Sequence, residues 1–323
     1  MLVLGVESSC DETSVAIVRN GKEVLANAIY TQIDIHKIFG GVVPEVASRE
    51  HVKKMIYIFE QALMDAKVTP KEIDLVAVTT TPGLIGSLLV GINAAKAFAL
   101  AHNIPCVDVN HIDGHIYANY IESDFHFPLL ALVVSGGHTE LVLMKEHYQF
   151  EILGQTLDDA VGEAYDKVGR VMGLDYPAGM YVDQLAQTGK PSYKLPFVYL
   201  DKDSYNFSFS GLKSAVLNII NKCNMKNEPI NVADLAASFQ SSVVTVLVDK
   251  TIKAAQTYKV KQIVVAGGVA ANQGLRKSLT DAVNKLENVK LTFPKMKYCT
   301  DNAAMIAVAG YFKYRFENDL KKC

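Results

Sequence analysis

An α/β protein with a duplicated architecture is the fold that this sequence predicts, and two observations lead to it. Short apolar runs alternate along the 323 residues with longer segments of helical periodicity, a pattern typical of α/β folds. In addition, residues 2–18 and 129–144 share one layout: an apolar run, a small or acidic turn and a second apolar run. Each is typical of a β-hairpin, and aligning Thr13 with Thr139 superposes the two turns. We therefore expect each half to open on a hairpin, although two unrelated hairpins would give the same pattern.

The length of the chain favours two domains. We expect an N-terminal lobe of residues 1–126 and a C-terminal lobe of residues 127–323. The final helix, about 303–321, is able to pack back on the first lobe. No low-complexity linker separates the two lobes.

The remaining elements follow from periodicity and from boundary signals. We expect helices over 46–66 and 85–101, from about 160 to Gly173, from 211 onward, over 232–258 and from 302 to about 321. We expect strands at 74–78, 105–109 and 262–266, and loops with short strands over 187–211. The expected N-terminal cap of the helix that stops at Gly173 is Asp158 or Asp159.

Composition restricts the functions that the chain can have. Half of its residues are hydrophobic and its formal net charge is -2, so RNA contact requires a local patch or a partner. Five cysteines without a CxxC pair favour a reduced, intracellular protein. Because no basic segment precedes the apolar N-terminus and polar residues interrupt the segment 85–101, we expect no signal peptide, a buried helix and no membrane span. A cytoplasmic location follows.

Two glycine-rich segments are candidates for phosphate binding. The first, Ser135-Gly136-Gly137-His138-Thr139, lies between two predicted strands, where successive N–H groups can form an anion-binding nest. The second, at Gly267-Gly268, leads from a strand into a helix start, where N–H groups and the helix dipole can face a ligand. Ordinary hairpin turns and tightly packed strand–helix turns use glycine in the same way. Together with the duplicated hairpin, the two segments favour a nucleotide bound between two lobes, as in the actin, hexokinase and Hsp70-type ATPases.

A metal site is indicated by His111 and His115, whose spacing places both imidazoles on one helical face. The glutamate that zinc peptidases carry after the first histidine is absent. Asp301, in Thr300-Asp301-Asn302 at a predicted helix start, is the candidate third ligand. The alternatives are an N-cap for Asp301 and an ordinary core or surface pair for the histidines.

Two further groups of polar residues are candidates. Asp11 and Glu12, in the first hairpin turn, are candidate catalytic residues, although they could simply shape the turn. A basic patch for RNA is predicted from a cluster that could equally be an exposed helix surface: His36, Lys37, Arg49, His51, Lys53 and Lys54.

Taken in order, these segments resemble a known family. The matching segments are 6–13 (VESSCDET), 40–45 (GGVVPE), 82–91 (PGLIGSLLVG), the His111/His115 pair, 135–139 (SGGHT), 206–213 (NFSFSGLK), 267–272 (GGVAAN) and 300–302 (TDN). They are similar, over nearly the whole chain, to the universal tRNA N6-adenosine threonylcarbamoyltransferase family of bacterial TsaD type. The resemblance implies the ASKHA (actin/hexokinase/Hsp70-like) fold, α/β, with two similar lobes around a nucleotide cleft.

The resemblance also implies functional residues. It implies one divalent metal ion, Fe²⁺ favoured and Zn²⁺ the alternative, held by His111, His115 and Asp301. It implies adenylate contacts from nine residues: Val133, Val134, Ser135, Gly136, Gly137, Asp166, Gly179, Asp183 and Asn272. The chain departs from the family at Ala178 and Met180, which replace a glycine and a proline around Gly179, and at Thr81, where a glycine is usual.

The activity implied by the resemblance is transfer of threonylcarbamoyl from threonylcarbamoyl-AMP to N6 of adenosine 37 in tRNAs that read ANN codons. The implied partners are tRNA, a degenerate paralogue of TsaB type and a small ATPase of TsaE type, with no membrane. Three alternatives remain open. A metallopeptidase would use the histidine pair, a small-molecule kinase of the same fold would use the glycine segments, and a chaperone-like ATPase would catalyse no transfer.

Overall fold

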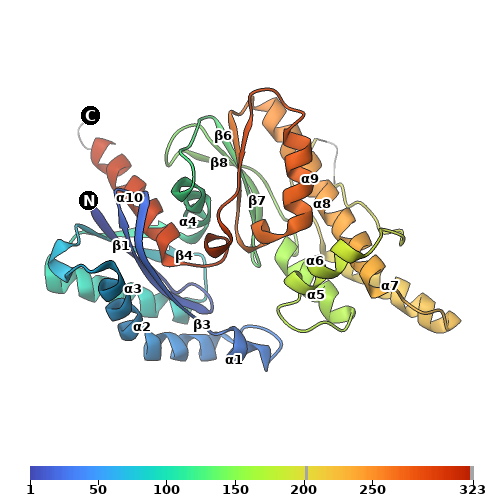
Figure 1. Cartoon of the computed structure of the whole chain (residues 1–323), viewed down its shortest axis with the longest axis horizontal. Coiled ribbons are helices and arrows are strands. Elements are labelled where there is room, and N and C mark those ends of the chain that lie inside the picture. Colours follow the sequence, from blue (N-terminus) through green and yellow to red (C-terminus); the bar gives the residue numbers. More distant parts are fainter. Residues whose placement is uncertain (201–202, 321–323) are drawn as a thin grey trace. The chain divides into compact units, whose positions relative to one another are not determined.

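The computed structural model describes residues 1–200 and 203–320, which group into two compact units (Figure 1). Unit 1 consists of Met1–Phe125 and Pro294–Cys323, and unit 2 of His126–Phe293. The C-terminal segment therefore groups with the first unit from Pro294 onward, and its final helix packs on the sheet of that unit.

Unit 1 is built on a mixed five-stranded sheet with the order β3-β2-β1-β4-β5. Its strands are β1 (Leu2–Glu7), β2 (Glu12–Arg19), β3 (Glu23–Thr31), β4 (Leu75–Thr81) and β5 (Cys106–Asn110). Strands β1 to β3 are antiparallel neighbours, whereas β4 and β5 run parallel to β1. The sequence predicted β1, β2, β4 and β5 but not β3, in which polar and apolar positions alternate weakly.

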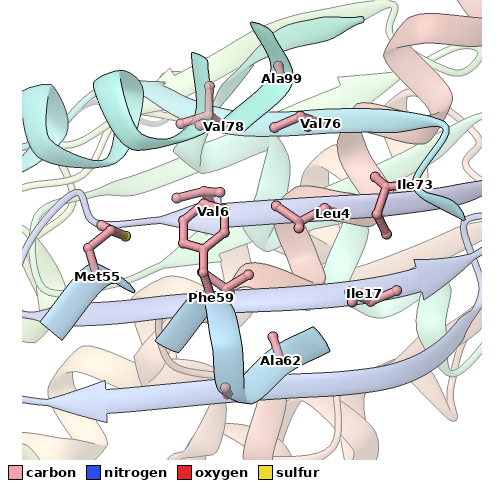
Figure 2. Close-up of a cluster of buried hydrophobic side chains, with 13 residues drawn as sticks. Leu4, Val6, Ile17, Met55, Phe59, Ala62, Ile73, Val76, Val78 and Ala99 are labelled. Atoms are coloured by element: carbon pink, nitrogen blue, oxygen red, sulfur yellow. The ribbon is translucent and has the colours of Figure 1, made fainter. Parts of the chain in front are cut away.

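Helices cover both faces of this sheet. They are α1 (Ile33–Lys37), α2 (Pro44–Ala66), α3 (Ile85–His102), α4 (His111–Tyr117) and α10 (Ala303–Leu320), with short 3₁₀ turns η1 (Pro70–Glu72), η2 (Ala118–Ile121) and η4 (Met296–Tyr298). Figure 2 shows Leu4 and Val6 of β1 packed against Phe59 of α2. Gly5 faces the opposite side, where an added Cβ would lie 2.3 Å from the Ala303 carbonyl oxygen, so α10 packs directly on the strand.

The prediction that 85–101 is a helix is confirmed, but the prediction that it is buried is wrong for much of its surface. Ile85 and Leu100 of α3 are about four-fifths exposed. Within residues 1–200 and 203–320, two helices are long and apolar enough to cross a membrane by length and composition alone, α3 and α8 (Val232–Thr257). In α8 two-thirds of the most apolar stretch is buried inside the protein, which is usual for a core helix.

Unit 2 is built on a second mixed five-stranded sheet with the order β10-β9-β6-β7-β8. Its strands are β6 (Leu129–Val134), β7 (Thr139–Met144), β8 (Phe150–Gln155), β9 (Gln262–Ala266) and β10 (Lys290–Thr292). Its helices are α5 (Val161–Val171), α6 (Gly179–Thr188), α7 (Ser210–Lys226), α8, η3 (Gly268–Ala271) and α9 (Gln273–Val283). The sequence did not predict β8, β10 or α6.

The two sheets have one topology. In each, an antiparallel three-stranded meander is followed by two strands parallel to its first strand. The predicted duplication is therefore confirmed, but the alignment of Thr13 with Thr139 is wrong. The closing pairs are Glu7 with Ser14 and Val134 with Thr139, so the first turn spans residues 8–13 and the second only 135–138.

The predicted cap of α5 is also wrong. The residue before its first turn is Ala160, whose side chain cannot accept a hydrogen bond. Asp158 instead accepts the N–H groups of Phe209 at 2.8 Å and Ser210 at 3.3 Å, at the start of α7. The predicted stop at Gly173 is confirmed, since Gly173 has a φ of +82°.

Candidate active site

Three side chains of unit 1 that could bind a metal ion lie close together: His111, His115 and Asp301. Each offers one ligand atom, a ring nitrogen or a carboxylate oxygen, and these atoms all lie within 4.8 Å of one another. Both histidines lie on α4, which starts directly after β5 and is capped by Asn110, whose side chain accepts the Ile112 N–H at 2.8 Å. A spacing of four residues places the two imidazoles on the same face. The fold thus brings the predicted trio together from distant parts of the chain.

Asp301 does not cap the helix that follows it. The first turn of α10 is capped by Asn302, whose Oδ1 accepts the Met305 N–H at 3.2 Å. The Asp301 Oδ1 atom instead lies 3.5 Å from His111 Nε2 and 3.2 Å from His115 Nε2. The alternative that Asp301 serves as an N-cap is therefore wrong.

The orientation of the His111 ring is fixed by a buried carboxylate that sequence reasoning missed. Glu7, at the end of β1, is fully buried, and its Oε2 lies 3.0 Å from His111 Nδ1. The same carboxylate accepts the Thr79 hydroxyl at 2.6 Å and the Ser9 N–H at 2.6 Å. With Nδ1 held in this way, His111 Nε2 faces Asp301, an arrangement typical of metal-binding histidines.

The donor set fits a divalent metal ion. Both ring nitrogens of His115 are buried and lack a well-formed hydrogen bond among residues 1–200 and 203–320, although Asp301 Oδ1 lies 3.2 Å from Nε2. Buried nitrogens without a partner are costly, and a metal ion shared with Asp301 and His111 would satisfy one of them. Two imidazoles and one carboxylate also leave coordination positions open.

The charges of the cluster depend on one another. Burial raises the pKa of the Asp301 carboxyl, but attraction to His111 and then His115 outweighs it and holds that pKa well below its usual range. Burial lowers the pKa of His111, yet the carboxylates of Asp301 and Glu7 outweigh this effect and raise it well above the ordinary value. Burial and the neighbouring His111 lower the pKa of His115. His115 is therefore neutral and has a nitrogen lone pair to offer a metal.

The predicted catalytic residues Asp11 and Glu12 lie in the same unit as this cluster. Asp11 is 9% exposed, and its backbone carbonyl accepts the Gln32 N–H at 3.1 Å. Burial, and then the charges of Asp301 and Asp11, raise the pKa of Glu12 well above its usual value. Burial and Asp11 also raise the pKa of the Cys10 thiol, which excludes a reactive thiolate beside them. The charge of Asp301 thus influences the carboxyl group of Glu12 in the first turn.

The predicted basic patch is wrong for two of its six members. His36 and His51 are both fully buried. His51 supports the first turn, since its Nδ1 lies 2.7 Å from Thr13 Oγ1 and its Nε2 lies 3.0 Å from the Cys10 carbonyl oxygen. Glutamates neutralise two other members of the predicted patch, in the pairs Arg49–Glu45 and Lys53–Glu50. The spacing of the histidines along the sequence could not show whether their side chains are buried in the core or exposed on a charged surface.

In unit 2, the first glycine segment forms a tight turn at the end of β6. The Ser135 N–H donates to the His138 carbonyl oxygen at 2.9 Å, and the His138 N–H donates to Ser135 Oγ at 3.0 Å. A Cβ added at Gly136 or Gly137 would meet no atom of the described part of the chain within 4 Å, so packing there does not require glycine. A physical reason for glycine at these two positions is that it lets a ligand approach the backbone closely. Residues 133–134 are fully buried strand residues, so only their backbone can reach a ligand.

Asp166 and Gly179 are brought together by a hydrogen bond. Asp166 Oδ1 accepts the N–H groups of Ala178 at 2.8 Å and Gly179 at 3.2 Å, at the start of α6. Burial raises the pKa of Asp166, although these two N–H groups act in the opposite direction. Ala178, one of the departures from the family pattern, is buried and serves here through its backbone.

Asp183 and Asn272 are also brought together, through two residues that sequence reasoning missed. Both are less than a tenth exposed, and Gln240 and Tyr165 form hydrogen bonds that connect them. Gln240 lies on a buried face of α8, and Tyr165 lies on α5. Polar residues within an otherwise apolar helical pattern were the only sequence signal for this network.

Solved structures identify the fold class. A full-length HypF in its phosphate- and nucleotide-bound form aligns with 98% of this chain and 46% of its own, with a TM-score of 0.66 and 13% identity. A ROK hexokinase from Thermus thermophilus aligns with 98% of this chain and 100% of its own, with a TM-score of 0.52 and 13% identity. At such identities the likeness concerns the fold alone. Two sheets of one topology and these relatives define an ASKHA-fold protein, here with a His₂Asp site able to hold a metal.

The family follows from closer relatives. The family model described as "TsaD: tRNA N6-adenosine threonylcarbamoyltransferase" matches residues 23–308. Enzymes of this name from Staphylococcus aureus strains JH9 and MRSA252 are each 58% identical over 315 residues, covering 98% of this chain and 92% of the relative. The chain belongs to the tRNA N6-adenosine threonylcarbamoyltransferase family and is a transferase. The resemblance found in the sequence is thereby confirmed.

Proposed function

We propose that this chain transfers the threonylcarbamoyl group of L-threonylcarbamoyladenylate to N6 of adenosine 37 in tRNAs that read ANN codons, forming t6A37 and AMP. Family membership supports the reaction class. The single structural observation that carries the proposal is the buried cluster of His111, His115 and Asp301. The donor is a mixed anhydride with an activated carbonyl and a phosphate leaving group, so the reaction needs carbonyl polarisation and phosphate binding. It does not need the glutamate base of a peptidase.

His111, His115 and Asp301 would hold one divalent ion, with Fe²⁺ favoured and Zn²⁺ the alternative, since two imidazoles and a carboxylate suit both. When bound, such an ion supplies Lewis-acid polarisation of the threonylcarbamoyl carbonyl. Glu7 keeps the His111 ring in the orientation that this requires.

We assign adenylate binding to unit 2. Residues 133–137 would contact the adenylate, and the backbone N–H groups of Gly136 and Gly137 in the open turn would bind the phosphate and stabilise the charge that grows on it as AMP departs. Asp166 with Gly179, and Asp183 with Asn272, would form the rest of the adenylate site. Their support is that the fold places them in two hydrogen-bonded pairs in the same unit.

Asp11 and Glu12 are the proposed proton acceptors. The exocyclic N6 amine is a weak nucleophile and must lose a proton as it attacks the carbonyl. Burial and the charge of Asp301 raise the pKa of Glu12, so its carboxylate is a stronger base than that of an ordinary glutamate. The variants Asp11→Asn and Glu12→Gln test the two residues separately, provided that each variant still binds metal and AMP. Unchanged turnover in both variants would contradict the role of proton acceptor.

Partner proteins complete the proposal. Helices α2 and α3 lie on the same face of the unit 1 sheet, and their outer surfaces carry large exposed apolar side chains: Val52, Ile56, Met64, Ile85 and Leu89. Such a surface favours a protein partner, and we propose the degenerate paralogue of TsaB type there, with a small ATPase of TsaE type joining the assembly. With a net charge of -2 on this chain, the tRNA surface would be completed by those partners. The activity would be cytoplasmic.

One reaction tests the proposed function. The purified chain and its two partners are incubated with threonylcarbamoyl-AMP and unmodified tRNA, and the nucleoside at position 37 is identified by mass spectrometry. The expected product is t6A with the wild-type chain and none with His115→Ala. Unmodified tRNA together with metal-dependent cleavage of a protein substrate would favour a peptidase. Unmodified tRNA with phosphorylation of a small molecule would favour a kinase.

A further inference from the structure

Gln240 has hydrogen-bond partners on both sides of its side-chain amide. It lies in α8 and is 7% exposed. Its Oε1 accepts from Asn272 Nδ2 at 2.8 Å and from the Tyr165 hydroxyl at 3.1 Å. Its Nε2 donates to Asp183 Oδ1 at 3.0 Å. One buried side chain therefore connects α5, α6 and the start of α9.

The two residues that Gln240 connects hold the segment 272–275 through further hydrogen bonds. Asp183 Oδ2 accepts the Gln273 N–H at 2.9 Å, and its Oδ1 is also 3.4 Å from the Gly274 N–H. Asn272 Oδ1 caps α9 by accepting the Leu275 N–H at 2.8 Å. The backbone after the second glycine segment thus depends on the orientation of two side chains that Gln240 orients.

The amide of Gln240 cannot be reversed without loss. Reversal would place its NH₂ against the donors of Asn272 and Tyr165, and its oxygen against the Asp183 carboxylate. Packing is tight as well, since a Cβ added at Gly274 would lie 2.3 Å from Gln240 Nε2. A hollow of about 380 Å³ lies beside Gln240 and Gly274. A residue that replaces Gln240 must therefore have a similar volume, so that water does not enter the space that the glutamine side chain fills.

We propose that Gln240 is a positioning residue for adenylate binding, acting by fixing Asp183, Asn272 and the backbone at 272–274 in their binding orientation. This inference rests on the proposed function, in which Asp183 and Asn272 belong to the adenylate site. Without the Gln240 amide, Asp183 loses a donor and Asn272 loses its nearest acceptor. Binding must then order both groups again, which reduces affinity for the nucleotide.

The test compares two buried glutamines of the same unit. Gln262 is fully buried at the start of β9, where its Nε2 donates to Thr292 Oγ1 at 2.8 Å and its Oε1 accepts the His126 N–H at 2.8 Å. It therefore has partners on both sides like Gln240, but at the end of β9 opposite the glycine segment. Gln240→Leu and Gln262→Leu remove the same groups and keep similar volume.

AMP binding is measured by calorimetry on the full chain, and KM and kcat for threonylcarbamoyl-AMP are measured in the complete assembly. Gln240→Leu should weaken AMP binding about tenfold and raise KM similarly, with a smaller effect on kcat. Gln262→Leu should leave AMP affinity unchanged, even where its melting temperature falls as much. Equal AMP affinity in Gln240→Leu and wild type, or an equal loss in both variants, would overturn the proposal.

Gln240→Glu provides a second test that does not depend on how well Gln240→Leu folds. It keeps an acceptor for Asn272 and Tyr165 but places a second carboxylate against Asp183 where Gln240 has a donor. AMP affinity should fall by about threefold or more, because the orientation of Asp183 is no longer held. An AMP affinity equal to that of the wild type would contradict the positioning role. A wild-type chain that neither binds AMP nor modifies tRNA would instead contradict the proposed function itself.

Discussion

The two units share one sheet topology but place different chemistry in the turn after the first strand. In unit 1 that turn spans 8–13, follows the buried carboxylate of Glu7 and carries two further acidic residues. In unit 2 it spans only 135–138 and presents glycine backbone. One scaffold therefore carries acidic side chains at this position in one copy and open glycine backbone in the other. The two equivalent turns differ in both length and composition.

The electrostatic requirements of the carboxylate–imidazole cluster in unit 1 and of the glycine turn in unit 2 also differ. Buried carboxylates and imidazoles are stable only in partnership, which is why Glu7, His111 and Asp301 shift one another's pKa values in unit 1. The turn of unit 2 needs no buried charge, because backbone N–H groups already carry the partial positive charge that attracts phosphate. Substitutions should therefore have separable effects in the two units.

The largest effect is expected at the third metal ligand. Asp301→Ala removes the only carboxylate of the trio and should reduce t6A formation roughly a hundredfold or more. Activity in the assembled system and metal content by mass spectrometry are the measurements. His102→Ala, an exposed histidine on α3, is the control and should retain both. Normal metal content and normal activity in Asp301→Ala would rule out the assigned ligand set.

A smaller effect is expected at the carboxylate behind the histidine. Glu7→Gln keeps the shape of a fully buried residue but weakens its hold on His111 Nδ1. Metal affinity, measured by competition with a chelating dye, should fall roughly 10–100-fold, as it does when such supporting groups are changed elsewhere. Glu72→Gln, in the exposed η1 turn, should leave metal affinity unchanged. If both variants bind metal as the wild type does, Glu7 has no supporting role.

Whether a feature of this protein could be predicted from the sequence depends on how far apart along the chain the interacting residues lie. Strands such as β1 and β6 and the His111/His115 spacing are local patterns, so they were predictable. Asp301 was a candidate ligand from the sequence alone, but the family resemblance was needed to prefer a ligand over an N-cap, because nothing local distinguishes the two. Glu7 and Gln240 could not be assigned roles from the sequence, since their partners come from strands and helices far along the chain.

Errors of prediction have the same origin. His51 was predicted to lie on a basic surface, but helical spacing does not say which face of α2 meets the sheet, and His51 is on the buried face. Asp158 was predicted to cap the helix next to it, whereas its N–H donors come from a segment fifty residues further on.

Replacing a glycine with alanine should affect stability in unit 1 and AMP binding in unit 2. Gly5→Ala places a methyl group against the Ala303 carbonyl oxygen and should lower the free energy of unfolding by about 1–3 kcal/mol. Gly136→Ala meets no atom and should leave stability unchanged while weakening AMP binding several-fold. Thermal unfolding and calorimetry measure the two effects. A stability loss at Gly136 without a loss of AMP binding would reverse this assignment.

The smallest effect concerns pH. Burial lowers the pKa of His51, so this residue stabilises the fold above the unfolded-state value of 6.5, and its contribution is lost as the pH falls towards the lower folded-state value. The melting temperature should therefore fall more steeply between about pH 7 and about pH 5 in the wild type than in His51→Gln, which has no titrating group. Parallel curves would show that His51 titrates alike in both states.

One pair of variants tests most directly whether unit 1 holds the metal and unit 2 binds the adenylate. Metal content and AMP affinity are both measured on Asp301→Ala and on Gly136→Val. We expect that Asp301→Ala loses the metal and keeps AMP affinity, and that Gly136→Val keeps the metal and loses AMP affinity. Loss of both properties in each folded variant, or of neither, would contradict the division of roles between the two units.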